Sequence, residues 1–209
     1  MNTNLFDHAF PFTGLFQRQA AILEAAVKQL AEILHTFTAV PDKCVRIGAL
    51  VADGSIMARK IERELSLTFI HPLNREDIRE LSRAFERTLR AVGAVSSRLG
   101  LYGFRDLQQG AGSHAAGLAE MATEIAPLLK VIVRKGNGAA SSDRVRKLKQ
   151  EADLFLLVGL GELYESAGGS GAKLLETMKW SQVYDRLEET ATCLEHTVNV
   201  IEGIIQKKV

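Results

Sequence analysis

The sequence has no long apolar run, few aromatic residues and no excess of charge of either sign. Its longest strongly apolar run, 154–160, is about a third of the ~20 residues that a membrane-spanning helix needs. Phe, Trp and Tyr make up 6% of the chain, and 26 basic residues are balanced by 25 acidic ones. Nucleic-acid binders usually gather a basic excess on one face and stack bases on aromatic rings. These absences argue against a membrane-spanning protein and against a nucleic-acid binder.

Cysteine is nearly absent as well. Cys44 and Cys193 are far apart and form no C-x-x-C motif, so we expect free thiols in a reducing compartment. The first residues show no basic region followed by an apolar run and a cleavage site, and we expect no signal peptide. The sequence therefore predicts a cytoplasmic protein that is not transmembrane.

The chain also lacks the local motifs of common enzyme classes. Residues 110–115 formally fit the fingerprint G-x-G-x-x-A, but residues 102–107 are too short and interrupted to form the strand that this motif requires. Residues 168–174 resemble a phosphate-binding loop only superficially, because Ala172 and Leu174 break the order of glycine, lysine and hydroxyl residue. No G-x-S-x-G elbow occurs. We expect no catalytic residues and a protein that is not an enzyme.

Apolar residues recur every three or four positions along most of the chain, which is the pattern of amphipathic helices. No segment alternates with a period of two for long enough to form a strand. Residues 136–142 and 168–171 are typical of loops, and Pro127 is expected to kink the fourth helix. The sequence thus predicts an all-α bundle of six long helices. Their seams run over 23–37, 42–65, 78–99, 118–132, 143–165 and 178–206.

The order of three helices, a loop and three helices suggests an internal duplication. Placing Glu86 beside Glu188 aligns the third helix with the sixth, and placing Asp53 beside Glu151 aligns the second with the fifth. Because identity between the halves is weak, chance similarity of amphipathic helices stays an alternative. We predict one helical domain over 1–209, built from repeats at about 13–103 and about 104–207.

The turn between the second and third helices carries a family signature. Residues 68–78 read Thr-Phe-Ile-His-Pro-Leu-Asn-Arg-Glu-Asp-Ile. Pro72 disfavours helix at the residue before it, and Asn74 can cap the next helix, whose positive end favours the acids that follow. With 99–102, 151–153 and 199–204, this turn resembles the PhoU-related family of phosphate transport regulators, in particular its Pit-transporter accessory branch. The family turn motif corresponds to Phe69, Pro72, Arg75, Glu76 and Asp77, and the sequence departs from it at His71.

The resemblance implies a fold and a role. It implies a PhoU-like elongated bundle and a non-enzymatic regulatory or accessory protein of inorganic phosphate transport that acts by protein–protein docking. The implied partner is an inorganic phosphate transporter at the membrane face. A location peripheral to the inner membrane and a homo-oligomer are both compatible with that role.

Members of the wider superfamily bind iron or zinc through acidic residues four positions apart, which lie on one helical face. Here each expected pair has lost a carboxylate: Arg90 follows Glu86, and Lys149 precedes Asp153. We therefore expect no metal cofactor and interpret the remaining acids as solvated helix-face charges. A metal-binding helical protein holding iron or zinc stays an alternative, with Glu86, Glu151, Asp153, Glu188 and Glu195 as the ligands of a relic site.

Two further features suggest binding surfaces. Basic residues flank the loop at 136–142, where a transporter or anionic lipid headgroups could meet them, although a solvated loop flank is the preferred explanation. These candidate partner-binding residues are Arg134, Lys135, Arg144, Arg146 and Lys147, offset in the sequence only by Asp143. The run 154–160 is apolar on all sides, so we expect it either at the centre of the bundle or against another subunit.

A small-molecule sensor is the remaining alternative. Small residues within the expected helices permit either a ligand cavity or close packing between helices. These residues are Gly93, Ala94, Gly117, Gly159 and Gly161.

Overall fold

The computed structural model describes residues 12–67, 73–104, 106–134, 138–167 and 170–207. Within these ranges all regular secondary structure is α-helical, which confirms the predicted all-α bundle. The helices are α2 (Thr13–Thr36), α3 (Val40–Leu67), α4 (Arg75–Tyr102), α5 (Gln109–Thr123), α6 (Ile125–Arg134), α7 (Ala139–Glu165) and α8 (Gly171–Gln206).

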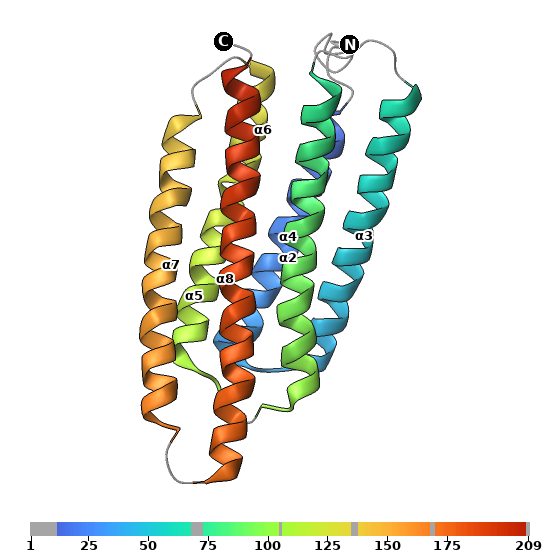
Figure 1. Ribbon diagram of the computed structural model, residues 1–209. Coiled ribbons are helices and arrows are strands. Elements are labelled where there is room, and N and C mark those ends of the chain that lie inside the picture. Colours follow the sequence, from blue (N-terminus) through green and yellow to red (C-terminus); the bar gives the residue numbers. More distant parts are fainter. Residues whose placement is uncertain (1–11, 68–72, 105, 135–137, 168–169, 208–209) are drawn as a thin grey trace.

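The helices run along one long axis, with α3 and α7 at opposite edges of the bundle (Figure 1). Helix α3 packs against α2 and α4, and α7 packs against α5 and α8. The two groups join where α4 meets α8 and where α2 meets α5. Thus α2, α4, α5 and α8 form the centre, and no other described helix covers the outer long side of α3 or of α7.

The apolar seam predicted for α4 faces the core, as its spacing requires. Phe85, Leu89 and Val92 are all fully buried. In α8, Trp180 and Tyr184 are among the largest side chains that are fully enclosed. Burial of these rings and branched chains supplies the main favourable term for holding the helices together.

Polar contacts fix α4 against α8 within this apolar interface. The Thr88 hydroxyl donates to the backbone carbonyls of Ala84, at 2.9 Å, and of Cys193, at 3.1 Å. It also lies 3.0 Å from the Thr197 hydroxyl. A buried hydroxyl without a partner would be costly, so these bonds favour one register between the two helices.

Three helix boundaries differ from the sequence prediction. The fourth predicted helix is two helices, α5 and α6, which separate at Glu124. Pro127 falls in the first turn of α6, where its missing N–H costs no hydrogen bond. Helix α7 begins at Ala139, so 139–142 are helical and the expected loop there is wrong. Helix α8 begins at Gly171 because the Ser170 side chain caps it, accepting from the Lys173 N–H at 3.3 Å.

Candidate functional site

The described part of the family turn motif lies in the first turn of α4. Arg75, Glu76 and Asp77 open that helix, and the Asn74 side chain accepts a hydrogen bond from the Glu76 N–H at 2.9 Å, which confirms the expected cap. Phe69 and Pro72, together with His71, lie outside the described residues.

Asp77 is buried, and it connects the motif to the end of α8. The Lys207 ammonium donates to its carboxylate at 2.6 Å, and this bond raises the pKa of Lys207 above its ordinary value. The side chain of Asp77 is 9% exposed, whereas that of Lys207 is 64% exposed. Asp77 thus holds the last turn of α8 against the first turn of α4.

A shallow cleft of 230 Å³ opens beside this ion pair, between α4 and α8. Two segments that carry the family resemblance, the first turn of α4 and residues 199–204 of α8, both contribute to its walls. Its lining is mixed in charge, with carboxylate, imidazole, amide and ammonium groups. The lining residues are Asp77, Glu80, His196, Asn199, Val200, Gly203, Ile204 and Lys207.

Two of the basic residues around the predicted loop, Arg144 and Arg146, lie on α7 and pair with acids from outside that helix. Arg144 lies 3.3 Å from Glu120 and 3.0 Å from Glu124, across the α5–α6 junction. Arg146 pairs with Glu202 of α8 and with Asp143. The expectation that Asp143 alone offsets this charge is therefore wrong, because the acids that balance it come from distant parts of the sequence.

The other candidate partner-binding residues are less informative. Lys147 is 78% exposed and lies 3.9 Å from Glu151. Arg134 is the last residue of α6, and Lys135 lies outside the described residues. Through the contact of Arg146 with Glu202, the start of α7 and residues 199–207 of α8 lie at one end of the bundle.

The candidate metal ligands do not fit a cluster. Glu86 lies 3.9 Å from Arg90, and Asp153 lies 2.7 Å from Lys149. A cation would have to displace ammonium or guanidinium groups that already neutralise these carboxylates. Glu188 is exposed and Glu195 is half-buried. In the part of the chain that the structure describes, no group of three or more His, Cys, Asp or Glu side chains is placed to hold a metal ion.

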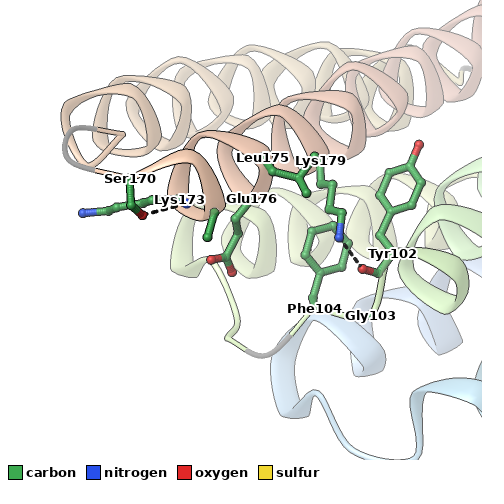
Figure 2. A pocket seen from close by; sticks show the side chains of 9 residues that line it. Tyr102, Gly103, Phe104, Ser170, Lys173, Leu175, Glu176 and Lys179 are labelled. Atoms are coloured by element: carbon green, nitrogen blue, oxygen red, sulfur yellow. Dashed lines mark hydrogen bonds between the residues drawn. The ribbon is translucent and has the colours of Figure 1, made fainter.

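A second cleft, of 420 Å³, lies at the opposite end of the bundle, where α4 ends and α8 begins (Figure 2). The sequence did not predict this cleft. The Lys179 ammonium donates to the Tyr102 carbonyl at 2.8 Å, and the Phe104 ring packs on Trp180 at 4.2 Å between centroids. Two sequence signals fall on this cleft: Gly103, which ends α4 with a φ of 62°, and the segment 168–174, of which Ser170, Ala172 and Lys173 line the cleft. Its described lining holds no pairing of a nucleophile with a base, so it does not suggest catalysis.

Three of the small residues, Gly93, Gly117 and Gly159, serve close packing. A Cβ at Gly93 would lie 3.2 Å from a Val51 methyl group, and one at Gly159 would lie 2.5 Å from the Tyr184 hydroxyl. At Gly117 the added atom would touch Ala152 at 3.6 Å. These contacts favour tight helix packing over the ligand cavity of a small-molecule sensor.

Comparisons with known proteins give relatives that cover most of the chain. It is 23% identical over 202 residues to the "Putative pit accessory protein" of Rhizobium meliloti (strain 1021), covering 95% of this chain and 94% of the relative. It is 21% identical over 147 residues to the UPF0111 protein YkaA of Bacillus subtilis (strain 168), covering 69% of this chain and 70% of that one. No family model matches the chain.

Two crystal structures from Shewanella oneidensis MR-1 share the fold. A PhoU-like protein superimposes with a TM-score of 0.79 at 13% identity, covering 93% of this chain and 99% of that one. A "putative PhoU-like phosphate regulatory protein" superimposes with a TM-score of 0.76 at 12% identity, with the same coverage. The predicted PhoU-like bundle is confirmed. Among the described helices, none is long and apolar enough to cross a bilayer.

Proposed function

We propose that this chain is a non-enzymatic accessory regulator of inorganic phosphate transport. Its PhoU-like fold and its sequence similarity confirm its resemblance to the PhoU-related family. The observation that carries the proposal is similarity over 95% of the chain to a relative described as a pit accessory protein. The PhoU-like fold supports it independently. The protein would act in the cytoplasm, in peripheral contact with a transporter in the inner membrane.

The end of the bundle formed by the first turn of α4 and the last turns of α8 is the proposed docking surface. Two segments with the family resemblance meet there, beside a shallow cleft of mixed charge. Glu80 and Asn199 are exposed in its walls and available to a partner. A shallow polar cleft suits a protein–protein contact better than a small ligand, which would need a deeper and more apolar pocket.

We expect the proposed docking to require no metal cluster. Three of the five candidate carboxylates, those of Glu86, Glu151 and Asp153, lie within 4 Å of an arginine or lysine of the protein, as Asp153 does of Lys149. Elemental analysis after loading with iron or zinc is expected to return far less than one ion per chain. Stoichiometric retention of either metal after dialysis would contradict this part of the proposal.

Affinity purification from gently solubilised host membranes tests the docking. A phosphate transporter is expected to co-purify with the tagged wild-type protein and to be depleted with the double variant Glu80→Lys, Asn199→Lys. Both substituted residues are exposed, so the variant should fold normally. The matched control is Asp106→Lys, an exposed acid near the opposite end of the bundle.

The control separates a local contact from a general charge effect. Equal recovery of the transporter with the double variant and with Asp106→Lys would contradict docking at the proposed surface. Recovery of no transporter with the wild type would remove the docking mechanism itself.

A further inference from the structure

Helix α7 presents apolar side chains on the side that faces away from the bundle. Leu154, Leu157 and Val158 are 61%, 66% and 51% exposed. With Gly161, they stand at positions i, i+3, i+4 and i+7, which is the spacing by which a helix contacts another helix. We call these four residues the outer strip of α7.

The inner side of α7 is already satisfied by the core. Ala152, Leu156 and Leu163 are buried against the neighbouring helices. An edge helix needs only that one apolar side. The location of residues 154–160 at the centre of the bundle, one of the two sequence expectations, is therefore wrong, and the outer strip is a second apolar surface on the same helix.

The outer side of α3, the helix at the opposite edge of the bundle, offers a comparison for the side chains at the outer strip of α7. In the predicted alignment of α3 with α7, buried Ile61 and Leu65 fall opposite buried Gly159 and Leu163. In the same alignment the outer strip falls opposite Ile56, Arg59, Lys60 and Arg63, all exposed and three of them charged. At these positions α3 thus presents mostly charged side chains, whereas α7 presents apolar ones.

Gly161 adds a second, independent observation. A glycine inside a helix costs about 0.5–1 kcal/mol relative to alanine, so its presence usually has a packing reason. Gly159 has one, because the Tyr184 side chain lies against it. An atom added at Gly161 would meet nothing within 4 Å. The described part of the chain gives no packing reason for Gly161, as it gives none for Gly48 or Gly203; on the apolar outer strip, close approach of another helix would supply one.

The apolar surface continues from α7 onto the first turns of α8. The Tyr164 hydroxyl lies 3.1 Å from that of Ser181, which brings the two helices together at this point. Phe155, Tyr164, Leu174 and Met178 are each between 45% and 58% exposed. With the outer strip they expose on the order of 800 Å², about what each partner contributes to a stable interface and more than the ~300–600 Å² patch of an ordinary monomer.

The charges that border the strip identify its occupant. Arg144 and Lys147 lie toward the N-terminal end of α7, and Glu162 and Glu165 lie toward its C-terminal end. In an antiparallel pair with Leu154 over Gly161, Lys147 of one copy would lie within about one helical turn of Glu165 of the other, whereas Arg144 is already paired with Glu120 and Glu124 of its own chain. Anionic lipid headgroups would instead be repelled by the acidic half.

We propose that the outer strip of α7 is the interface with a second copy of this chain, with the two α7 helices antiparallel across a two-fold axis. In this arrangement Leu154 of one copy packs over Gly161 of the other, and Leu157 meets Val158. The surface lies on an edge of the bundle and leaves the α4–α8 cleft accessible in both copies.

Sedimentation velocity over about 1–100 μM protein tests the interface, because a dissociation constant of micromolar order falls in this range. The wild type is expected to be a dimer, and Leu157→Glu is expected to raise the dissociation constant at least ~10-fold. The matched control Ile56→Glu, on the outer side of α3, is expected to leave it unchanged. A monomeric wild type, or a Leu157→Glu protein that still dimerises like the wild type, would overturn the proposal.

Gly161→Leu supplies a second test in which folding and association change in opposite directions. Leucine is the better helix former, and the site is open in the single chain, so the melting temperature at low protein concentration should rise. The dissociation constant of the dimer should rise as well, because the new leucine side chain would occupy the space that Leu154 of the other copy fills. A stabilised variant with unchanged association would show that the strip is not the interface.

Discussion

At the scale of single residues, buried polar groups set how the bundle responds to solution conditions. His114 of α5 is fully buried, and its Nδ1 lies 2.9 Å from the Ala152 carbonyl of α7. Its Nε2 has no hydrogen-bond partner among the described residues. Burial lowers the pKa of this imidazole below its ordinary value of 6.5, although the Ala152 and Leu187 carbonyls and the Asp153 and Glu188 carboxylates oppose the shift.

The lowered pKa of His114 predicts a loss of stability on acidification. The unfolded chain takes up a proton near pH 6.5, whereas the folded chain resists it, so the unfolded state binds more protons in this window. The free energy of unfolding is therefore expected to fall as pH drops below 6.5. Urea titrations at a series of pH values measure the free energy of unfolding. His114→Gln should flatten its dependence on pH. The control His35→Gln, at an exposed residue, should leave that dependence as in the wild type. An unchanged slope in His114→Gln would contradict the assignment.

At the scale of helices, the packing of α5 depends on how closely its glycines approach neighbouring backbone. A Cβ at Gly112 would lie 2.8 Å from the Leu34 carbonyl oxygen of α2, a backbone atom that cannot move aside alone. A Cβ at Gly117 would meet Ala152 of α7 at an ordinary 3.6 Å. Two glycines of one helix thus have opposite consequences when a methyl group is added.

We expect Gly112→Ala to lower the free energy of unfolding by about 1–3 kcal/mol, because overpacking forces α2 and α5 apart. Gly117→Ala is expected to raise it by up to ~1 kcal/mol, because alanine is the better helix former. Chemical denaturation of both variants under one set of conditions gives the comparison. Equal changes of one sign in the two variants would show that the close approach at Gly112 does not matter.

The helices also show what sequence periodicity can and cannot predict. The seam of α4 was read correctly, because burial of one helical side follows directly from spacing of three and four. The start of α8 was placed too late, because a glycine-rich segment resembles a loop until Ser170 is seen to cap it. The acids that pair with Arg144 and Arg146 could not be predicted, since Glu124 and Glu202 become neighbours only through the tertiary fold.

At the scale of the whole molecule, the two ends and the two edges of the bundle differ in chemistry. One end joins family-like segments of α4 and α8 through Asp77 and Lys207. At the positions that correspond to the outer strip of α7, which is apolar, α3 carries mostly charged side chains. A transporter contact at the end and a self-association surface at the edge are therefore compatible in one assembly.

The division into two three-helix repeats stays a prediction at this scale. The sequence indicated it through weak alignment of the third helix with the sixth. The turn residues Phe69 and Pro72 add nothing to the account, because they lie outside the described residues.

The most direct measurement of the central claim is phosphate uptake by a host strain that lacks this gene, complemented in parallel with three versions of it. The account predicts that deletion changes uptake of inorganic phosphate. The wild type and Asp106→Lys should restore the original rate, and the double variant Glu80→Lys, Asn199→Lys should not, despite normal folding and abundance. Uptake that is the same with and without the gene would contradict a role in phosphate transport.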